Sequence, residues 1–169
     1  MDISIIVPVF NRPEEVKDLL ESLAAQTDSD FEVIIVEDGS TLPCKVECDA
    51  FAGKLDIRYL TKPNEGRSKA RNYGMDYAAG DYFIIFDSDC IIPPHYIATV
   101  RRSLEEDYVD CFGGPDRADE GFSDLQKAIS YAMTSVLTTG GIRGTAGKKD
   151  KFTPRSFNMG ISGECYRKV

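Results

Sequence analysis

The stretch Phe83-Ile84-Ile85-Phe86-Asp87-Ser88-Asp89 decides the fold, because four apolar residues run directly into two carboxylates. A short, continuous apolar run is typical of a strand that is buried on both faces of a sheet. In an extended chain, Asp87 and Asp89 point the same way and lie roughly 6.6 Å apart. Two such carboxylates repel each other unless a proton or a cation lies between them. Mg²⁺ is usually held by one or two carboxylates together with substrate phosphates, so the stretch indicates a metal–phosphate site or, alternatively, an ordinary acidic turn.

Outward from this stretch, short apolar runs alternate with amphipathic segments. The apolar runs predict strands at residues 3–7, 31–36, 55–60, 82–86, 108–112 and 157–161. Helical spacing predicts helices at 14–26, 43–53, 67–79, 94–106 and 123–137, with Pro13 suited to the first turn of the first helix. This alternation is typical of an α/β fold with a mostly parallel sheet flanked by helices. We see no internal repeat or linker, and 169 residues suit a single domain.

Carboxylates and other polar side chains follow the predicted strands. In sheets of this kind, ligands bind outside the carboxyl ends of the strands. The strand ends carry Phe10-Asn11, Glu37-Asp38-Gly39-Ser40, residues 61–66 and Asp87-Ser88-Asp89. Carboxylates therefore gather at one edge of the sheet, which favours the metal–phosphate interpretation. Asp38 either binds a base N–H or a ribose hydroxyl, or caps its own Asp-Gly turn.

Two further segments have phosphate-binding features. Asn64-Glu65-Gly66 leads into a helix start, where free N–H groups favour anions and Arg67 or Arg71 can add a bidentate contact. The alternative is a plain turn followed by a solvated basic face. The loop at residues 140–151 mimics a phosphate-binding P-loop but lacks its first glycine and its Ser or Thr. That loop is either a lid or acceptor-phosphate contact, or a solvated flexible loop.

Composition narrows the class of protein. The chain is 42% hydrophobic and 28% charged, and its formal net charge of −8 argues against a nucleic-acid partner. No segment looks like a signal peptide or a membrane span. Five scattered cysteines make neither a disulfide framework nor a zinc site, which favours a reducing, cytoplasmic location. They are Cys44, Cys48, Cys90, Cys111 and Cys165.

Taken together, the motifs resemble those of the family-2 glycosyltransferases, which have the GT-A fold. The resemblance runs from Ile5 to about Tyr166, nearly the whole chain. It rests on the joint order and spacing of Val7-Pro8-Val9-Phe10-Asn11, Val36-Glu37-Asp38-Gly39-Ser40, Asn64-Glu65-Gly66, Ala70-Arg71-Asn72, Gly80-Asp81-Tyr82, Asp87-Ser88-Asp89 and Asn158-Met159.

This resemblance implies an inverting enzyme that moves a sugar from a nucleotide-diphosphate donor, usually UDP-linked, to a glycan or lipid-linked acceptor. It implies that Asp38 holds the base and that Arg67 lies near the pyrophosphate. Asp87 would lie near the ribose or sugar, and Asp89, with Asp87, would hold Mn²⁺ or Mg²⁺ against the diphosphate. The complete set of expected nucleotide-sugar-binding residues is Pro8, Val9, Asn11, Glu37, Asp38, Gly66, Arg67, Asp87 and Ser88.

The resemblance assigns no residue of this chain as the general base. In this family the base is commonly an acidic residue some way beyond the Asn-Met segment, so we expect it beyond Val169. Residues 1–169 are then expected to be a single GT-A domain that is truncated on its acceptor side. Membrane association would come only through the missing part, at the cytoplasmic face. If the base lies inside the chain, Asp116, Asp119 and Glu120 are the first candidates.

Two alternative functions stay open at this level. Phosphohydrolases of the haloacid dehalogenase type also place Asp-x-Asp after an apolar strand. They usually use the first strand, whereas Asp87 follows the fourth predicted strand here, and the residues after Asp89 are Cys90-Ile91. The other alternative is a non-catalytic module that binds a nucleotide sugar.

Overall fold

The structure is a computed structural model, and it describes residues 1–114, 124–125, 128, 131–132 and 158–168. The strands are β1 (Ile3–Val9), β2 (Phe31–Asp38), β3 (Asp56–Lys62), β4 (Tyr82–Ile85), β5 (Cys111–Gly113) and β6 (Met159–Ser162). The helices are α1 (Pro13–Ala24), α2 (Lys45–Phe51), α3 (Arg67–Tyr77), α4 (Tyr96–Glu106) and α7 (Gly163–Lys168). The predicted helix at 123–137 lies largely outside the described residues, and the loop at 140–151 lies entirely outside them.

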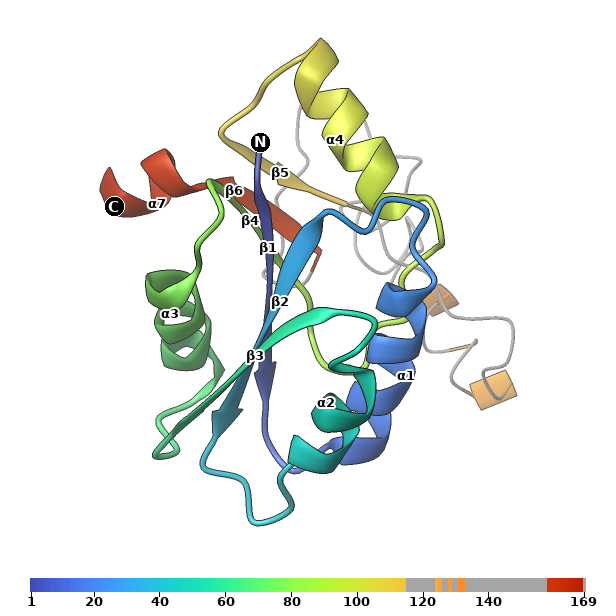
Figure 1. The fold of residues 1–169 in the computed structure, drawn as a ribbon, viewed down its shortest axis with the longest axis vertical. Helices are drawn as coiled ribbons and strands as arrows, with labels where there is room; N and C mark the ends of the chain where they lie inside the picture. Colours follow the sequence, from blue (N-terminus) through green and yellow to red (C-terminus); the bar gives the residue numbers. More distant parts are fainter. Residues whose placement is uncertain (115–123, 126–127, 129–130, 133–157, 169) are drawn as a thin grey trace.

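The strands form one six-stranded sheet in the order β3-β2-β1-β4-β6-β5 (Figure 1). The first four strands run parallel, and β6 is antiparallel to both of its neighbours. The α/β fold class and the mostly parallel sheet are therefore confirmed. Helices cover both faces, with α1 and α2 on one side of β1 and β2 and α3 on the other (Figure 1).

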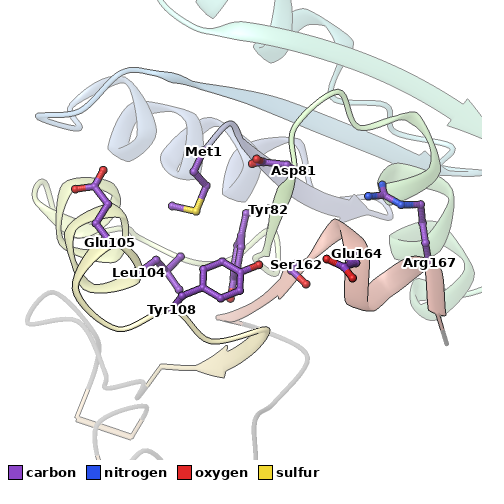
Figure 2. Close-up of a pocket in the computed structure, with 9 residues that line it drawn as sticks. All are labelled: Met1, Asp81, Tyr82, Leu104, Glu105, Tyr108, Ser162, Glu164 and Arg167. Carbon is purple, nitrogen blue, oxygen red and sulfur yellow. The ribbon is translucent and has the colours of Figure 1, made fainter.

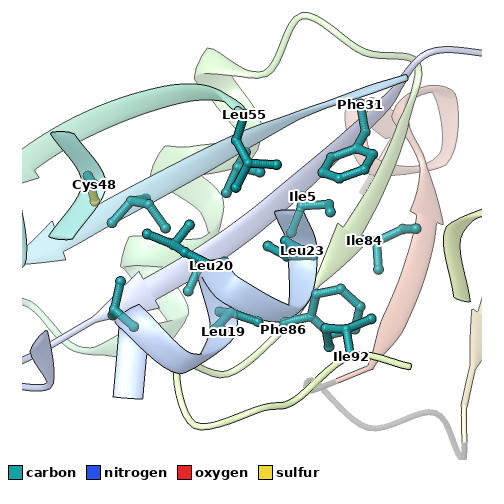
Figure 3. Close-up of a cluster of buried hydrophobic side chains, with 14 of the residues drawn as sticks. Ile5, Leu19, Leu20, Leu23, Phe31, Cys48, Leu55, Ile84, Phe86 and Ile92 are labelled. Carbon is teal, nitrogen blue, oxygen red and sulfur yellow. The ribbon is translucent and has the colours of Figure 1, made fainter. Parts of the chain in front are cut away.

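Alternate residues of the buried strands build two cores. Ile3, Ile5, Val7 and Val9 of β1 face α1, where Leu19, Leu20 and Leu23 pack against them (Figure 3). Ile6 points to the other face and joins Ile34, Val36 and Ala70 under α3. Because successive side chains in a strand point to opposite faces, an uninterrupted apolar run is what a doubly covered strand needs.

Several strand and helix ends differ from the predicted ones by one to three residues, and one helix was not predicted. β1 continues through Pro8 to Val9, two residues beyond the predicted end. Pairing with β4 stops at Ile6, so Pro8 lies where β1 has a strand on only one side, and the missing N–H is tolerated as it is at a sheet edge. The helix α7 was not predicted, because its six residues are too few for an amphipathic pattern.

Candidate functional site

A pocket of about 290 Å³ opens at the carboxyl ends of β1, β2 and β4. The chain leaves β1 toward β2 on one side, whereas β4 lies on the other side, so β1 is the switch point at which α/β sheets bind ligands. The lining residues are Pro8, Val9, Phe10, Arg12, Asp38, Arg67, Asp87, Ser88 and Asp89. The structure thus brings together residues that lie up to 81 positions apart in the chain.

Asp38, the last residue of β2, organises one wall of the pocket. Its carboxylate accepts hydrogen bonds from Lys62 Nζ at 2.7 Å, from the Glu65 N–H at 3.0 Å and from the Gly66 N–H at 2.8 Å. Burial raises the pKa of Asp38, but the Lys62 bond and the two N–H bonds outweigh it and hold that pKa below its usual value. Asp38 therefore reaches across to another loop and does not cap its own turn. A carboxylate has about four acceptor sites, which leaves one for a ligand.

The turn after Asp38 depends on Gly39. This residue has a φ of +72°, and a Cβ placed on it would lie 2.5 Å from Asn64 N. Only glycine allows both the positive φ and the close approach of the 64–66 turn. The turn itself ends at Gly66, with a φ of +93°, whose N–H group is bound to Asp38. Gly66 therefore supports the wall without lining the pocket.

Asp87 follows β4 and forms an ion pair with Arg71 of α3, with Nη2 and Oδ1 2.5 Å apart. Arg71 is buried, and its Nε has no hydrogen-bond partner within the described part of the chain. Arg71 does not line the pocket, whereas Arg67 does. Of the two arginines proposed for phosphate contact, Arg67 is the one at the pocket, and no ion pair holds it among the described residues. It occupies the first turn of α3, where N–H groups favour an anion.

Asp89 is exposed and pairs with Arg12, whose Nη1 lies 3.2 Å from Asp89 Oδ2. Sequence reasoning did not select Arg12 as a site residue. The available signal was its position, one residue after Asn11 in the segment that leaves the carboxyl end of the first strand. Phe10 lines the same pocket and is also exposed.

Glu37 and Asn11 lie beside the pocket and support its loops. Glu37 is buried and accepts hydrogen bonds from the Cys44 N–H at 2.9 Å, from Tyr59 Oη at 2.8 Å and from the Ser40 hydroxyl. Asn11, with a φ of +54°, accepts hydrogen bonds from the N–H groups of residues 41 and 42. Glu37 and Asn11 thus hold the 39–44 loop against the end of β1.

The cysteines near this loop are unsuited to nucleophilic chemistry. Cys44 and Cys48 are buried with their Sγ atoms 4.0 Å apart. The contact with Cys48, burial and the neighbouring Glu37 carboxylate all raise the pKa of Cys44, so its thiolate is disfavoured.

The residues at the pocket fit a hard divalent cation bound together with phosphates. The part of the chain that the structure describes contains no cluster of three or more Cys, His, Asp or Glu side chains suited to a metal. Mg²⁺, however, needs only one or two carboxylates when a diphosphate supplies the other oxygens. Asp89 offers an exposed carboxylate on the pocket wall, and Asp87 lies two residues away.

A larger pocket of about 400 Å³ lies near the opposite edge of the sheet (Figure 2). It is lined by Met1, Asp81 and Tyr82 near the amino ends of β1 and β4, and by residues of α4 and α7. Three carboxylates and one arginine line it, whereas the smaller pocket has two arginines beside its three carboxylates and is therefore the better match for a diphosphate. Position and charge both make the smaller pocket the candidate site.

The family model for glycosyl transferase family 2 matches residues 4–162. Among curated proteins, glycosyltransferase GlyG of Streptococcus pneumoniae is 34% identical over 110 residues, which are 64% of this chain and 36% of GlyG. The chain therefore spans just over a third of that relative's length. Among the described helices, none combines the length and the apolar character needed to cross a membrane.

Solved structures show the same architecture. TarS of S. aureus in complex with UDP-GlcNAc is 28% identical, with a TM-score of 0.67 over 73% of this chain and 36% of TarS. The mannosyltransferase PcManGT of Pyrobaculum calidifontis, in complex with GDP-Man and Mn²⁺, is 21% identical, with a TM-score of 0.62 over 69% of this chain and 35% of that enzyme. The expected GT-A fold is confirmed by the TarS likeness.

Proposed function

The chain belongs to glycosyl transferase family 2, and from that premise we propose that its pocket binds a nucleotide-diphosphate sugar, with UDP as the nucleotide. The protein would transfer the sugar to a hydroxyl of a glycan or a lipid-linked acceptor, with a divalent cation, Mn²⁺ or Mg²⁺, at the diphosphate. The observation that carries this proposal is that one pocket at the β1 switch point contains both Arg67, which has no ion-pair partner among the described residues, and the exposed carboxylate of Asp89. The family membership also argues against the alternative function as a phosphohydrolase of the haloacid dehalogenase type.

Each wall of the pocket suits a different part of such a donor. The remaining acceptor site of Asp38 suits a base N–H or a ribose hydroxyl. Arg67 suits the diphosphate, because a guanidinium binds phosphate oxygens in a bidentate manner. Asp89 and Asp87 would hold the cation, which neutralises charge on the leaving diphosphate. The TarS complex with UDP-GlcNAc supports UDP as the nucleotide.

The proposed reaction is a single displacement with inversion. The acceptor oxygen forms a bond to the anomeric carbon while the bond from that carbon to the diphosphate oxygen breaks, and a base takes the acceptor proton. Asp38 and Asp87 are engaged in ion pairs and Asp89 is assigned to the cation, so we place the base outside the described residues. Asp116, Asp119 and Glu120 lie there too.

A thermal-shift panel of nucleoside diphosphates with and without Mn²⁺ tests the donor site. We expect UDP to raise the melting temperature and Mn²⁺ to enlarge the effect, because a ligand at 100 times its Kd adds about 2.7 kcal/mol to stability. GDP and ADP serve as controls for the base, and uridine for the diphosphate. A melting temperature that no nucleoside diphosphate changes, with or without Mn²⁺, rules out the proposal.

A further inference from the structure

The carboxylates of the pocket differ in how tightly they are paired. Asp38 and Lys62 form a pair whose side chains are 4% and 6% exposed, and in the pair of Asp87 with Arg71 the arginine is only 7% exposed. In the pair of Asp89 with Arg12, by contrast, the side chains are 56% and 48% exposed. An exposed pair of this kind contributes about 0–1 kcal/mol and is therefore the one that opens easily.

The surroundings of Arg12 allow its side chain to leave Asp89. Arg12 occupies the N-cap position of α1 but makes no side-chain cap hydrogen bond, so its guanidinium is not needed to start the helix. Glu15, in the first turn of the same helix, lies 3.8 Å from Arg12 Nη1 and offers a second partner. Arg12 also lines the pocket together with Arg67, so both guanidinium groups can reach a ligand bound there.

We propose that Arg12 is an exchangeable counter-ion of Asp89: it neutralises this carboxylate before the donor binds, and it is displaced onto the donor diphosphate when a divalent cation takes its place. This inference rests on the proposed function. The divalent ion and the guanidinium are both positive and repel each other, so they compete for the exposed carboxylate of Asp89. Once released, the guanidinium is close enough to the pocket to add a charge-assisted hydrogen bond to phosphate.

This exchange predicts opposite effects of one substitution on two ligands. Replacing Arg12 by Gln removes the competitor, so Mn²⁺ alone should bind about twofold to fivefold more tightly, which is the scale of an exposed ion pair. The same change removes a phosphate contact, so UDP at saturating Mn²⁺ should bind about tenfold more weakly. Uridine, which has no phosphate, should bind as it does to the wild-type protein.

Lys17→Gln is the matched control, because it removes one positive charge from the exposed surface of the same helix outside the pocket. Any general attraction of Mn²⁺ to a more acidic protein appears equally in that variant. Mn²⁺ binding without nucleotide is measured by the loss of the free-ion electron paramagnetic resonance signal, and nucleotide binding is measured by calorimetry. Circular dichroism verifies that both variants are folded, and Arg12→Lys should keep the competition while weakening the bidentate phosphate contact.

Mn²⁺ affinity that is the same in Arg12→Gln and Lys17→Gln overturns the counter-ion role. An equal loss of uridine and UDP affinity in Arg12→Gln overturns the phosphate contact. If the wild-type protein binds Mn²⁺ but no nucleotide, the proposed function fails, whereas a tighter Mn²⁺ complex in Arg12→Gln would still establish the competition. The two failures are therefore distinguishable.

Discussion

Glu37 and Asp38 are neighbours in β2, yet their carboxylates face opposite sides of the sheet, because side chains alternate along a strand. Asp38 lines the pocket, while Glu37 is buried among Cys44, Tyr59 and Ser40. Burial and the bond to Glu37 raise the pKa of Tyr59, so this hydroxyl stays protonated and keeps donating its hydrogen bond. Asp38 thus lines the pocket, and Glu37 holds the loop beside it.

At this residue scale, two substitutions should separate nucleoside binding from metal binding. Asp38→Ala should weaken uridine and UDP alike, by about tenfold, because it deletes the acceptor and releases the 64–66 turn. Asp89→Ala should leave uridine binding unchanged and abolish the dependence of UDP binding on Mn²⁺, because it removes an oxygen ligand. Calorimetry with both ligands decides this, and equal losses of uridine affinity in the two variants would contradict the assignment.

The position of α3 depends on close contact with the sheet. Gly74 lies at the centre of this contact, where a Cβ would be 2.7 Å from Ile6 Cγ2 and 3.0 Å from Val36 Cγ2. Both neighbours are completely buried, so neither can move away freely. Since α3 begins at Arg67 and also carries Arg71, its distance from the sheet sets where both guanidinium groups lie.

At the scale of this element, Gly74→Ala should destabilise the protein by about 1–3 kcal/mol through overpacking, although alanine is the better helix former. The matched control is Gly53→Ala after α2, where a Cβ would meet nothing within 4 Å. That control should be neutral or slightly stabilising. Urea unfolding of the two variants measures the difference. A loss of the same size in both, or in neither, would show that α3 can move to accept the methyl group.

One partly buried and one buried ion pair connect distant parts of the molecule. Arg101 of α4 bonds to Asp28 at 2.7 Å and also to the carbonyl oxygens of Met1 and Asp30. Burial raises the pKa of Asp28, but the Arg101 bond and a backbone N–H outweigh it and hold that pKa below its ordinary value. The Arg101 pair thus ties α4 to the N-terminus and to the start of β2, while Asp38 and Lys62 tie β2 to β3.

For the whole molecule, these lowered pKa values predict sensitivity to acid. A carboxyl group with a depressed folded-state pKa contributes stability that is present above its unfolded pKa and is lost as the pH falls through the folded value. The contributions of Asp28 and Asp38 should therefore be complete at neutral pH and disappear below about pH 4. Asp28→Asn should show a shallower loss of unfolding free energy in urea melts taken from pH 7 to about pH 2.5. Asp18→Asn, on the exposed side of α1, should keep the wild-type slope, and identical slopes in all three proteins would count against the argument.

Much of the fold follows from local pattern alone. The mainly apolar runs that became β1, β2 and β4 are what a sheet needs when helices cover both of its faces. Pro13 and Gly66 mark helix starts through their own backbone preferences. The sequence also placed Asp38, Arg67, Asp87 and Asp89 at one edge, because parallel strands all end on the same side.

Tertiary structure decided which of these residues meet the pocket and which have other partners. The ion pairs of Asp87 with Arg71 and of Asp89 with Arg12 join positions 16 and 77 residues apart, so no local sequence pattern predicts them. Alternation puts Glu37 and Asp38 on opposite faces, but the register of β2 against β1 decides which of them faces the pocket, since a shift of one residue exchanges the two faces. Side-chain periodicity is a property of the chain, whereas the partner of a charge is set by the distances that packing leaves between elements.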